Sequence, residues 1–572
     1  MKKNKKKKSP VRFVLLMSVL VAVVGIAAFV LERRSPSKEH MDLSEYFGIT
    51  ESTSGTAAET LAVIINGSVS EGSAIRDNGA LWISYTAVQA GVNPRVFYDS
   101  TESLVILTTP TEKRTYSLAD AETASFAKVV GEELYISESF LETVSDMRMT
   151  EYSDPDRLVY VTDFTYTGAS VTSDTAVRYR AGIKSDILTD LKAGENVRVQ
   201  DVEADGSENN KKVEGWVYVT TENGVTGYVQ EKALGEQTQV SEEHTSPVGE
   251  YTSISKDYKI NLAFHQTTNT TANAGFSALA AQASGINTVA PTWLFLNDSE
   301  GTVISHADAD YVAEAHDLGM EVWVVLNDFD GEVNSTDDTA RALNSTAARD
   351  NMIRTAISEV TAAGADGINI DFERVTEDSA GAFLQFIREL SIECRNKGLV
   401  LSIDNYVPAF TKYLNREEQG IVADYVVTMC YDENTSGAEA AGSVASLPFV
   451  RQGISDTLRE VPAEKTIIAI PFYTRLWSTV GTDKPSSTAC DMETAKNAVE
   501  TYDMTVRWDA DLGQNYAFTE LNGIKYEIWL EDAESVSEKM TLIREAGCAG
   551  VAEWKLGQET SDIWNVISEG LS

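Results

Sequence analysis

The stretch Ala365-Asp-Gly-Ile-Asn-Ile-Asp-Phe-Glu373 is the most informative part of this chain of 572 residues. Side chains alternate along a strand, so Asn369, Asp371 and Glu373 share one face while the apolar residues between them share the other. The apolar face can pack under helices, and the polar face must then line a cavity. Two neighbouring carboxyl groups in such a place keep a proton on one of them near neutral pH. The stretch therefore predicts a buried strand with a general acid, rather than two acids at a frayed strand end in water.

From about residue 255 onward, strand-like apolar runs alternate with amphipathic stretches such as 338–363 and 380–397. This alternation predicts an α/β fold, a (β/α)8 TIM barrel over 255–572, with a small inserted subdomain around 508–528. Active sites of such barrels lie at the carboxyl ends of the strands, where Glu373 falls. The expected strands are 259–264, 288–295, 321–326, 367–373, 400–405, 425–431, 466–472 and 550–554.

Three further motifs follow in order along the expected strands. They are Met429-Cys-Tyr431-Asp432, Ile470-Pro-Phe-Tyr473-Thr-Arg475-Leu-Trp477 and Gly550-Val-Ala-Glu553-Trp554. Together with the Asp-x-x-Asn-x-Asp-x-Glu strand, they resemble glycoside hydrolase family 18, in its bacterial cell-wall and spore-cortex N-acetylglucosaminidase type. The resemblance covers essentially the whole of 255–572, and four ordered motifs are far more specific than one.

The resemblance implies substrate-assisted retaining catalysis, in which the 2-acetamido carbonyl oxygen of the sugar is the nucleophile. It implies that Glu373 acts as general acid and base, that Asp371 accepts the acetamido N–H and that Tyr431 holds the acetamido oxygen. It puts Trp554 under the sugar ring. Supporting roles are implied for Asn369 and Asp366, and substrate contacts for Asp432, Tyr473, Arg475 and Met429. For Asp432, Tyr473 and Arg475, strand-end packing or an ion pair is the alternative.

Asn369 departs from the family pattern, because many members carry there an aspartate that shares a proton with the next acid. An amide removes one charge, so we expect Asp371 to ionise more easily. Bacterial spore-cortex and cell-wall members have a similar Asn-Ile-Asp-Phe-Glu segment. The departure favours peptidoglycan over chitin as the substrate.

The sequence predicts no cofactor and no metal. The acidic loop 327–331 lacks the full ligand spacing of a calcium site and is expected to be an acidic barrel loop near the substrate, and the histidines are scattered. The four cysteines have no Cys-x-x-Cys spacing, and Cys430 and Cys548 lie in apolar runs that are typical of small core residues.

An internal repeat occupies residues 60–163. Leu81-Trp-Ile-Ser84 and Leu104-Val-Ile-Leu-Thr108 are echoed by Leu134-Tyr-Ile-Ser137 and Leu158-Val-Tyr-Val-Thr162. Each copy predicts a strand, a short helix and a strand pair, and two copies would share one core. The pattern resembles the copper amine oxidase N-terminal-like stalk domain, a small α+β module, and this one has no histidine to bind copper.

Residues 165–236 contain, in order, Val-x-x-Arg, Leu-x-x-Gly-Glu, Gly-Trp and Gly-x-x-Gly-Tyr-Val motifs. This order resembles a small all-β bacterial SH3-like domain of the cell-wall-binding sort, and another small barrel with a tryptophan core is the alternative. Linkers are expected at 32–59 and 237–254, which are polar and rich in Ser, Thr and Glu.

Residues 13–31 form an apolar, uncharged run behind a lysine-rich tail, 1–12. As a helix this run would span ~28 Å, about the thickness of a bilayer core. The lysines favour a cytoplasmic tail, a transmembrane anchor and extracellular domains. A cleaved signal peptide, which would make the protein secreted, is the alternative. The formal net charge of −40 excludes non-specific nucleic-acid binding.

These features together predict a membrane-anchored, extracellular glycosidase that cleaves β-1,4 bonds after N-acetylglucosamine. Peptidoglycan is the expected polymer, and the SH3-like module the expected contact with the cell wall. One alternative is a non-catalytic sugar-binding protein on the same barrel, although Glu373, Asp371 and Tyr431 are all retained. Another alternative is a chitinase or an endo-β-N-acetylglucosaminidase.

Overall fold

The computed structural model describes residues 17, 35–49, 59–201, 212–333 and 335–572. The chain forms two compact units, one of residues 1–96 and 118–248 and the other of 97–117 and 249–572. The predicted transmembrane segment, 13–31, lies outside the described residues apart from Met17. Among the helices that the structure describes, none is long and apolar enough to cross a membrane.

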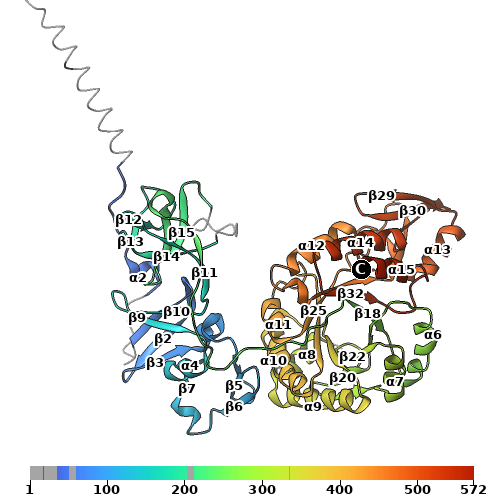
Figure 1. The fold of residues 1–572 in the computed structure, drawn as a ribbon, viewed down its shortest axis with the longest axis horizontal. Helices are drawn as coiled ribbons and strands as arrows, with labels where there is room; N and C mark the ends of the chain where they lie inside the picture. The colour runs from blue at the N-terminus through green and yellow to red at the C-terminus, as the bar shows by residue number, and fades with distance from the viewer. Residues whose placement is uncertain (1–16, 18–34, 50–58, 202–211, 334) are drawn as a thin grey trace, which may run out of the picture. The chain divides into compact units, whose positions relative to one another are not determined.

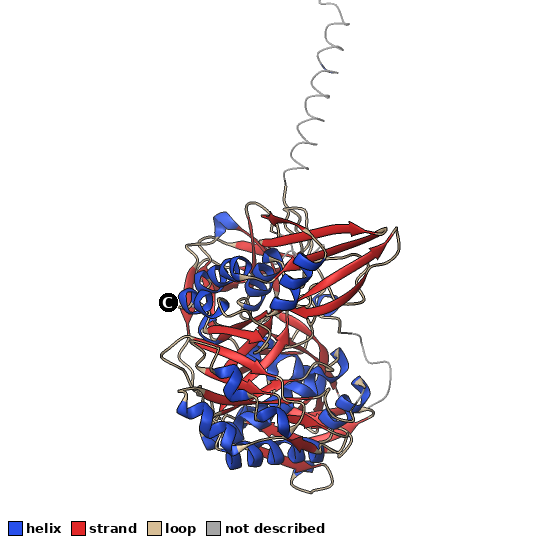
Figure 2. Cartoon of the chain, turned by 90° about the vertical axis from the view of Figure 1, so that its right-hand side faces the viewer, coloured by secondary structure: helices blue, strands red, loops and turns tan. Residues whose placement is uncertain are grey.

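The second unit is a closed barrel of eight parallel strands, which runs from green to red in Figure 1. Helices surround the strands, as Figure 2 shows in blue and red. All eight predicted strands are present, and the predicted TIM barrel is confirmed. The barrel strands are β18 (Ile260–His265), β19 (Thr288–Pro291), β22 (Glu321–Asn327), β23 (Gly367–Asp371), β24 (Val400–Tyr406), β25 (Tyr425–Met429), β26 (Thr466–Pro471) and β32 (Gly550–Trp554).

The helices of this unit alternate with the strands in the order that the sequence predicts. The predicted helix 380–397 is present with those bounds. The predicted amphipathic stretch 338–363 belongs to two helices. The second of them begins after Ser345, whose hydroxyl caps it by accepting from the Ala348 N–H. The helices are α5 (Thr270–Asn273), α6 (Phe276–Ala280), α7 (Ala309–Asp317), α8 (Thr336–Asn344), α9 (Thr346–Ala363), α10 (Ala380–Lys397), α11 (Arg416–Val422), α12 (Leu447–Thr457), α14 (Ala533–Glu545) and α15 (Ile563–Gly570), with short 3-10 turns at Glu377–Ser379 and Ala463–Lys465 and a small hairpin of β20 (Leu294–Leu296) and β21 (Val303–Ser305).

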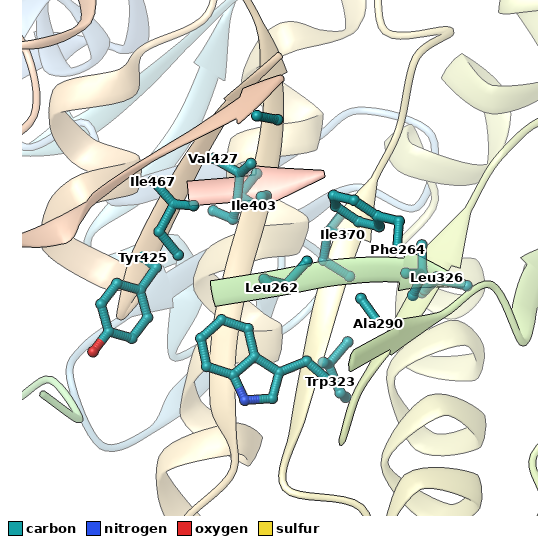
Figure 3. Packing of buried hydrophobic residues seen from close by; sticks show 14 of the residues in the cluster. Leu262, Phe264, Ala290, Trp323, Leu326, Ile370, Ile403, Tyr425, Val427 and Ile467 are labelled. Atoms are coloured by element: carbon teal, nitrogen blue, oxygen red, sulfur yellow. The ribbon is translucent and has the colours of Figure 1, made fainter. Parts of the chain in front are cut away.

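Apolar side chains from neighbouring barrel strands lie against one another, as Figure 3 shows for Leu262, Trp323, Ile370 and others. Burying each such side chain contributes about 1.5–3 kcal/mol. The ring closes where the first strand, β18, pairs with the last, β32, with Ile260 opposite Gly550. A Cβ at Gly550 would lie 2.1 Å from the Ile260 carbonyl oxygen, so this closure requires glycine.

The inserted subdomain is larger than the sequence predicts. It is a five-stranded antiparallel sheet with one helix, and it begins at Tyr473, directly after β26, rather than near residue 508. The segment 473–491 escaped prediction because β28 is short and polar, and because β27 pairs with β31, about fifty residues further along the chain. Its elements are β27 (Tyr473–Val480), β28 (Ser486–Asp491), α13 (Met492–Thr501), β29 (Thr505–Asp509), β30 (Gln514–Leu521) and β31 (Ile524–Leu530).

Residues 97–117 group with the barrel and supply most of a three-stranded sheet, β4 (Val96–Asp99), β5 (Leu104–Thr108) and β6 (Lys113–Ser117). The Asp99 carboxylate accepts from both the N–H and the hydroxyl of Thr346, at 2.7 and 2.5 Å. Glu102 accepts from the Ser345 hydroxyl at 2.8 Å. These acids cover the N-terminus of α9, where carboxylates satisfy otherwise unpaired backbone N–H groups.

The first unit contains a seven-stranded sheet that holds three of the four repeated segments, whereas Leu104–Thr108 lies in β5. The two repeated Leu-x-Ile-Ser segments lie in β3 and β8, which pair with Ile83 opposite Ile136. Ser84 and Ser137 each cap the short helix that follows. The elements are β1 (Glu59–Ile65), β2 (Ser68–Asp77), β3 (Ala80–Ser84), α3 (Tyr85–Ala87), β7 (Ala127–Val130), β8 (Glu133–Ser137), α4 (Glu138–Val144), β9 (Arg148–Tyr152) and β10 (Arg157–Val161).

A second, antiparallel seven-stranded sheet completes this unit. Parts of both expected linkers belong to it, since Phe47 is buried, Tyr46 donates to the Thr226 carbonyl oxygen at 2.8 Å, and residues 238–241 pair with β11. The elements are α2 (Leu43–Tyr46), β11 (Thr165–Ser170), β12 (Thr175–Arg178), β13 (Ile187–Leu191), β14 (Asn196–Val199), β15 (Trp216–Thr220), β16 (Thr226–Gln230) and β17 (Thr238–Ser241).

A buried ion pair joins the helices on either side of β23 in the chain. Arg349 of α9 donates through Nε and Nη2 to both oxygens of Glu389 in α10, at 3.2 and 3.1 Å, and both side chains are fully buried. Removing Arg349 leaves the buried Glu389 carboxylate with one cation among the described residues, Lys113, whose Nζ lies 3.4 Å from Oε2. We therefore expect Arg349→Met to lower the free energy of unfolding in urea by about 3–5 kcal/mol.

Arg354→Met is the matched control, because Arg354 lies on the same helix and is exposed. We expect it to change the free energy of unfolding by less than about 0.5 kcal/mol. Equal effects of the two substitutions would show that the buried pair does not hold α9 and α10 together.

Candidate functional site

Strand β23 carries Asn369 and Asp371 into the interior of the barrel, where both side chains are buried. The strand ends at Asp371, two residues earlier than predicted. Beyond it, the Asp328 carboxylate accepts from the backbone N–H groups of Glu373 and Arg374, at 2.9 and 3.1 Å. Because Asp328 follows the neighbouring strand β22, it turns the chain out of the sheet and fixes Glu373 at the carboxyl end of the barrel.

Asn369 is held by the next strand, β24. Its amide donates to the Ser402 hydroxyl at 3.0 Å and to the Asp404 carboxylate at 2.7 Å. Burial raises the pKa of Asp404 to about 8, although the Asn369 amide opposes this. Asp404 thus supplies a second carboxyl group at the position where Asn369 lacks one.

Asp371 is buried, and its Oδ1 has no hydrogen-bond partner among the described residues. Burial raises the pKa of Asp371 well above its ordinary value, and the neighbouring carboxyl groups of Glu373 and Asp404 add to this. The easier ionisation that Asn369 predicts is therefore opposed by burial and by Asp404.

Glu373 projects to the solvent-accessible mouth of the barrel and accepts a hydrogen bond from the Tyr406 hydroxyl. The protein atoms around it raise the pKa of its carboxyl by desolvation, and this outweighs the lowering effect of Tyr406. Asp328 and Asp432 raise it further. A carboxylic acid that keeps its proton toward neutral pH and can still reach solvent is suited to donating that proton.

Three predicted residues come together after β25. Met429 ends the strand and lines a cavity of about 260 Å³ with Glu373, Asp404 and Tyr406. Tyr431 is buried, and burial followed by Asp371 raises the pKa of its hydroxyl. Asp432 adopts a left-handed backbone conformation, with φ of 60°, and accepts from the Tyr473 hydroxyl at 2.5 Å.

Trp554 ends the last barrel strand, β32, and its half-buried ring lies 5.7 Å from the ring of Phe264, centroid to centroid. It lines a second cavity, of about 480 Å³, together with Tyr473 of the inserted subdomain. An indole face at the wall of a cavity offers a surface on which a sugar ring can stack.

Two predicted residues lie apart from this group. Asp366 precedes the amino end of β23, where it accepts from His316 Nε2 and from the Val322 N–H, each at 2.8 Å. Asp366 is five residues before Asp371 on an extended strand, and therefore roughly 16 Å away from it. Its hydrogen bonds stabilise the end of the barrel opposite the site. Arg475 points into the subdomain and donates to the Ser487 hydroxyl at 3.0 Å.

The sequence analysis missed Asp404 and Tyr406, and it placed Asp328 in an acidic loop near the substrate without a role. Each belongs to a predicted strand or to the residues just beyond one, at the carboxyl end of the barrel. The polar alternation Ser402, Asp404 inside the apolar strand 400–405 was the signal that could have revealed Asp404. Within the described residues, no group of three or more His, Cys, Asp or Glu side chains could hold a metal ion.

Comparison with known families settles what kind of barrel this is. The family model described as glycosyl hydrolases family 18 matches residues 267–559, just over half of the chain. The chain belongs to glycosyl hydrolase family 18. The matched region contains every candidate residue named above, and the barrel is a family 18 glycosidase domain.

Curated relatives of this family 18 protein include bacterial and fungal enzymes. YdhD of Bacillus subtilis, whose name describes a sporulation-specific glycosylase, is 29% identical over 39% of this chain and 54% of its own length. A cortical fragment-lytic enzyme of Bacillus cereus is 22% identical over 48% of this chain and 65% of its own. Endochitinase 1 of Metarhizium anisopliae is 25% identical over 40% and 59%. The chain thus matches about half to two thirds of the length of these relatives.

Among solved structures, the spore cortex-lytic enzyme SleL of Bacillus megaterium superposes with a TM-score of 0.50. The superposition covers 66% of this chain and 89% of that one, at 16% sequence identity. At this identity the likeness supports the fold.

The raised pKa of Asp404 predicts how the stability of the protein depends on pH. An aspartate in an unfolded chain has a pKa near 3.9. Since the folded value is about 8, the folded state holds the proton more tightly, and this contribution is lost as pH rises from about 4 to 8. Asp404→Asn cannot lose this proton. We therefore expect the free energy of unfolding of the variant in urea, relative to that of the native protein, to rise by about 1 kcal/mol per pH unit between pH 5 and pH 8.

Asp378→Asn, at an exposed position of the same region, is the control and should follow the native protein at both pH values. A constant difference between Asp404→Asn and the native protein across this range would contradict the assignment of a protonated Asp404.

Proposed function

We propose that this protein is a membrane-anchored, extracellular glycosidase that cleaves β-1,4 bonds after N-acetylglucosamine in peptidoglycan. The observation that carries the proposal is the pair of Asp371 and Glu373 at the mouth of the barrel. Glu373 has a raised pKa and reaches solvent, whereas Asp371 is buried directly behind it. A proton donor and a second acid placed in this way suit the substrate-assisted reaction of this family.

In the proposed reaction, Glu373 donates its proton to the glycosidic oxygen as the C1–O bond breaks. The acetamido carbonyl oxygen of the same sugar attacks C1 and forms a cyclic oxazolinium intermediate. Asp371 accepts the acetamido N–H and stabilises the positive charge. The ionised Glu373 then takes a proton from a water molecule, which opens the ring with net retention and restores the acid.

Tyr431 and Trp554 position the sugar in this proposal. Tyr431 is buried beside Asp371, and its hydroxyl donates to the acetamido oxygen so that this oxygen points at C1. Trp554 stacks against the apolar face of the pyranose ring. Asp432 and Tyr473, which are hydrogen-bonded to each other, and Met429 line the adjoining walls.

Several features favour peptidoglycan. Asn369 matches the segment typical of spore-cortex and cell-wall members, and two relatives carry names that refer to sporulation or cortex fragments. The apolar run 13–31 behind a basic tail supports a membrane anchor with the barrel outside the cell. The motifs of 165–236 support an SH3-like contact with the wall, and the repeat of 60–163 supports a stalk.

Chitin is the second candidate substrate, because the similarity extends to a fungal endochitinase. Purified peptidoglycan and N-acetylglucosamine oligomers, each incubated with residues 36–572, distinguish the two. Mass spectrometry of the products identifies the new reducing ends. Muropeptides that end in reducing N-acetylglucosamine support the proposal, whereas cleavage of the oligomers alone assigns the enzyme to chitin.

Replacing the proton donor should stop this reaction. We expect Glu373→Gln to lower kcat/KM by about 10²–10⁴-fold, since an amide cannot donate the proton. Glu377→Gln, an exposed acid four residues along the same loop, should retain full activity. Equal activity of Glu373→Gln and the native protein, or binding without any product in both, would refute catalysis by Glu373 and favour a sugar-binding protein.

We expect Tyr406 to lower the pKa of the Glu373 carboxyl group. Its hydroxyl donates to Glu373 and stabilises the carboxylate, which lowers the pKa of Glu373. Tyr406→Phe removes this effect, so the pKa of the acid should rise and the alkaline limb of the kcat/KM profile should move to higher pH. Tyr413→Phe is the control, because Tyr413 lines the same cavity but donates to the Val375 carbonyl oxygen. A shift to lower pH, or identical profiles for both variants, would contradict this role.

A further inference from the structure

The cavity of about 480 Å³ beside Trp554 carries a charge that the reaction described above does not use. It lies between the carboxyl end of β32 and the first strands of the inserted subdomain. Its polar lining groups include Lys555, Gln266 and Gln558 from the barrel, and Asp491 from the subdomain. All of these residues belong to the second unit.

Lys555 is a half-buried cation without a counter-ion. Its Nζ donates to the Gln266 side-chain oxygen at 2.5 Å, and no carboxylate of the described residues lies within ion-pair distance of it. Burial alone lowers the pKa of Lys555. In a chain with a formal net charge of −40, an ammonium group left without a carboxylate in a cavity wall is an unusual arrangement, because its partial desolvation is not offset.

Asp491 lines the same cavity but forms no ion pair with Lys555 within the described residues, and its carboxylate faces the backbone of α13. It caps helix α13 by accepting from the Thr494 N–H at 2.6 Å. Lys555 acts on His265. The pKa of this histidine is lowered to about 4, first by burial and then by the positive charge of Lys555. The histidine is therefore neutral at pH 7, and Lys555 is the cation that the barrel contributes to the cavity lining.

Gln558 provides a second, independent sign of a missing ligand. Its Oε1 is buried and has no hydrogen-bond partner among the described residues. A buried acceptor without a partner destabilises the site, and a ligand N–H or O–H group would satisfy it. The cavity therefore combines a stacking face at Trp554, a free acceptor at Gln558 and an uncompensated cation at Lys555.

We propose that Lys555 and Gln558 form a subsite for a sugar that carries a carboxylate, in which Lys555 binds the carboxylate and Gln558 accepts from an amide or hydroxyl of the same ligand. The inference rests on the proposed function and narrows its substrate class. In peptidoglycan the sugar with these groups is N-acetylmuramic acid, whose lactyl carboxylate is free where no peptide is attached. Neutral N-acetylglucosamine polymers lack the anion.

The test compares two forms of one glycan. The first form is peptidoglycan strands from which the peptides have been removed, so that the lactyl carboxylates are free. In the second form, the same carboxylates have been converted to methylamides. Equilibrium binding is measured with Glu373→Gln protein, so that no cleavage occurs. We expect the carboxylate form to bind more tightly, and Lys555→Met to reduce this preference by about ten-fold, in line with the loss of one hydrogen bond to a charged group.

Two further variants separate charge recognition from folding. Lys555→Arg keeps the charge and should retain the preference in large part. Lys484→Met removes an exposed lysine of the subdomain that pairs with Glu439, and it should keep the full preference. An unchanged preference in Lys555→Met, or an equal loss of affinity for both glycans, would overturn the subsite.

The subsite and the proposed function fail in different ways. If the native protein cleaves either glycan but binds the two forms equally, the enzyme assignment stands and the subsite is refuted. If it binds the carboxylate form preferentially in a Lys555-dependent manner but releases no product, the subsite stands and the glycosidase proposal is refuted.

Discussion

The site depends on one buried carboxylate. Asp328 accepts from two successive backbone N–H groups, those of Glu373 and Arg374, and its Oδ2 also accepts from the Thr339 hydroxyl at 2.9 Å. Without these bonds the chain after β23 would have no reason to leave the sheet at Asp371. Because two backbone bonds fix the direction of the chain, they also fix where the Glu373 carboxyl emerges. The position of Glu373 is therefore fixed through its backbone, and the hydroxyl of Tyr406 orients its carboxyl oxygen atoms.

The carboxyl ends of neighbouring strands gather several acids in a small volume. Burial is the largest cause of the raised pKa of Asp371, Asp404 and Glu373; Glu373 adds to the pKa of the other two, and Asp328 and Asp432 add to that of Glu373. Such a cluster holds protons that a solvent-exposed cluster would lose. On the other side of the barrel mouth, Lys555 is a cation without a carboxylate partner in the described part of the chain. The two walls of the site thus differ in charge, and the reacting sugar would lie where they meet.

Strong local patterns explain most of what could be predicted. The eight barrel strands are mostly apolar runs between amphipathic helices, and α10 was predicted with its observed bounds from its amphipathic pattern; Gly398 ends it in the left-handed conformation. Predictions failed where local preference is weak. Strand ends depend on capping partners from other strands, as Asp328 shows for β23. The inserted subdomain starts with β27 at Tyr473, and the pairing of β27 with β31 sets Trp477 opposite Glu527, fifty residues further along the chain.

The sequence by itself determined the barrel and the family and predicted Asp371, Glu373 and Tyr431 as site residues, because these follow from alternation along single strands and from motifs of a few residues. Only the tertiary structure decided which residues surround them. Asp404 stands next to Asn369 through strand pairing between residues 35 positions apart, and Lys555 stands without a counter-ion only because of what the fold brings near it. Distances between side chains and the burial that sets their pKa values arise when strands close into a ring, and no short segment of sequence contains that information.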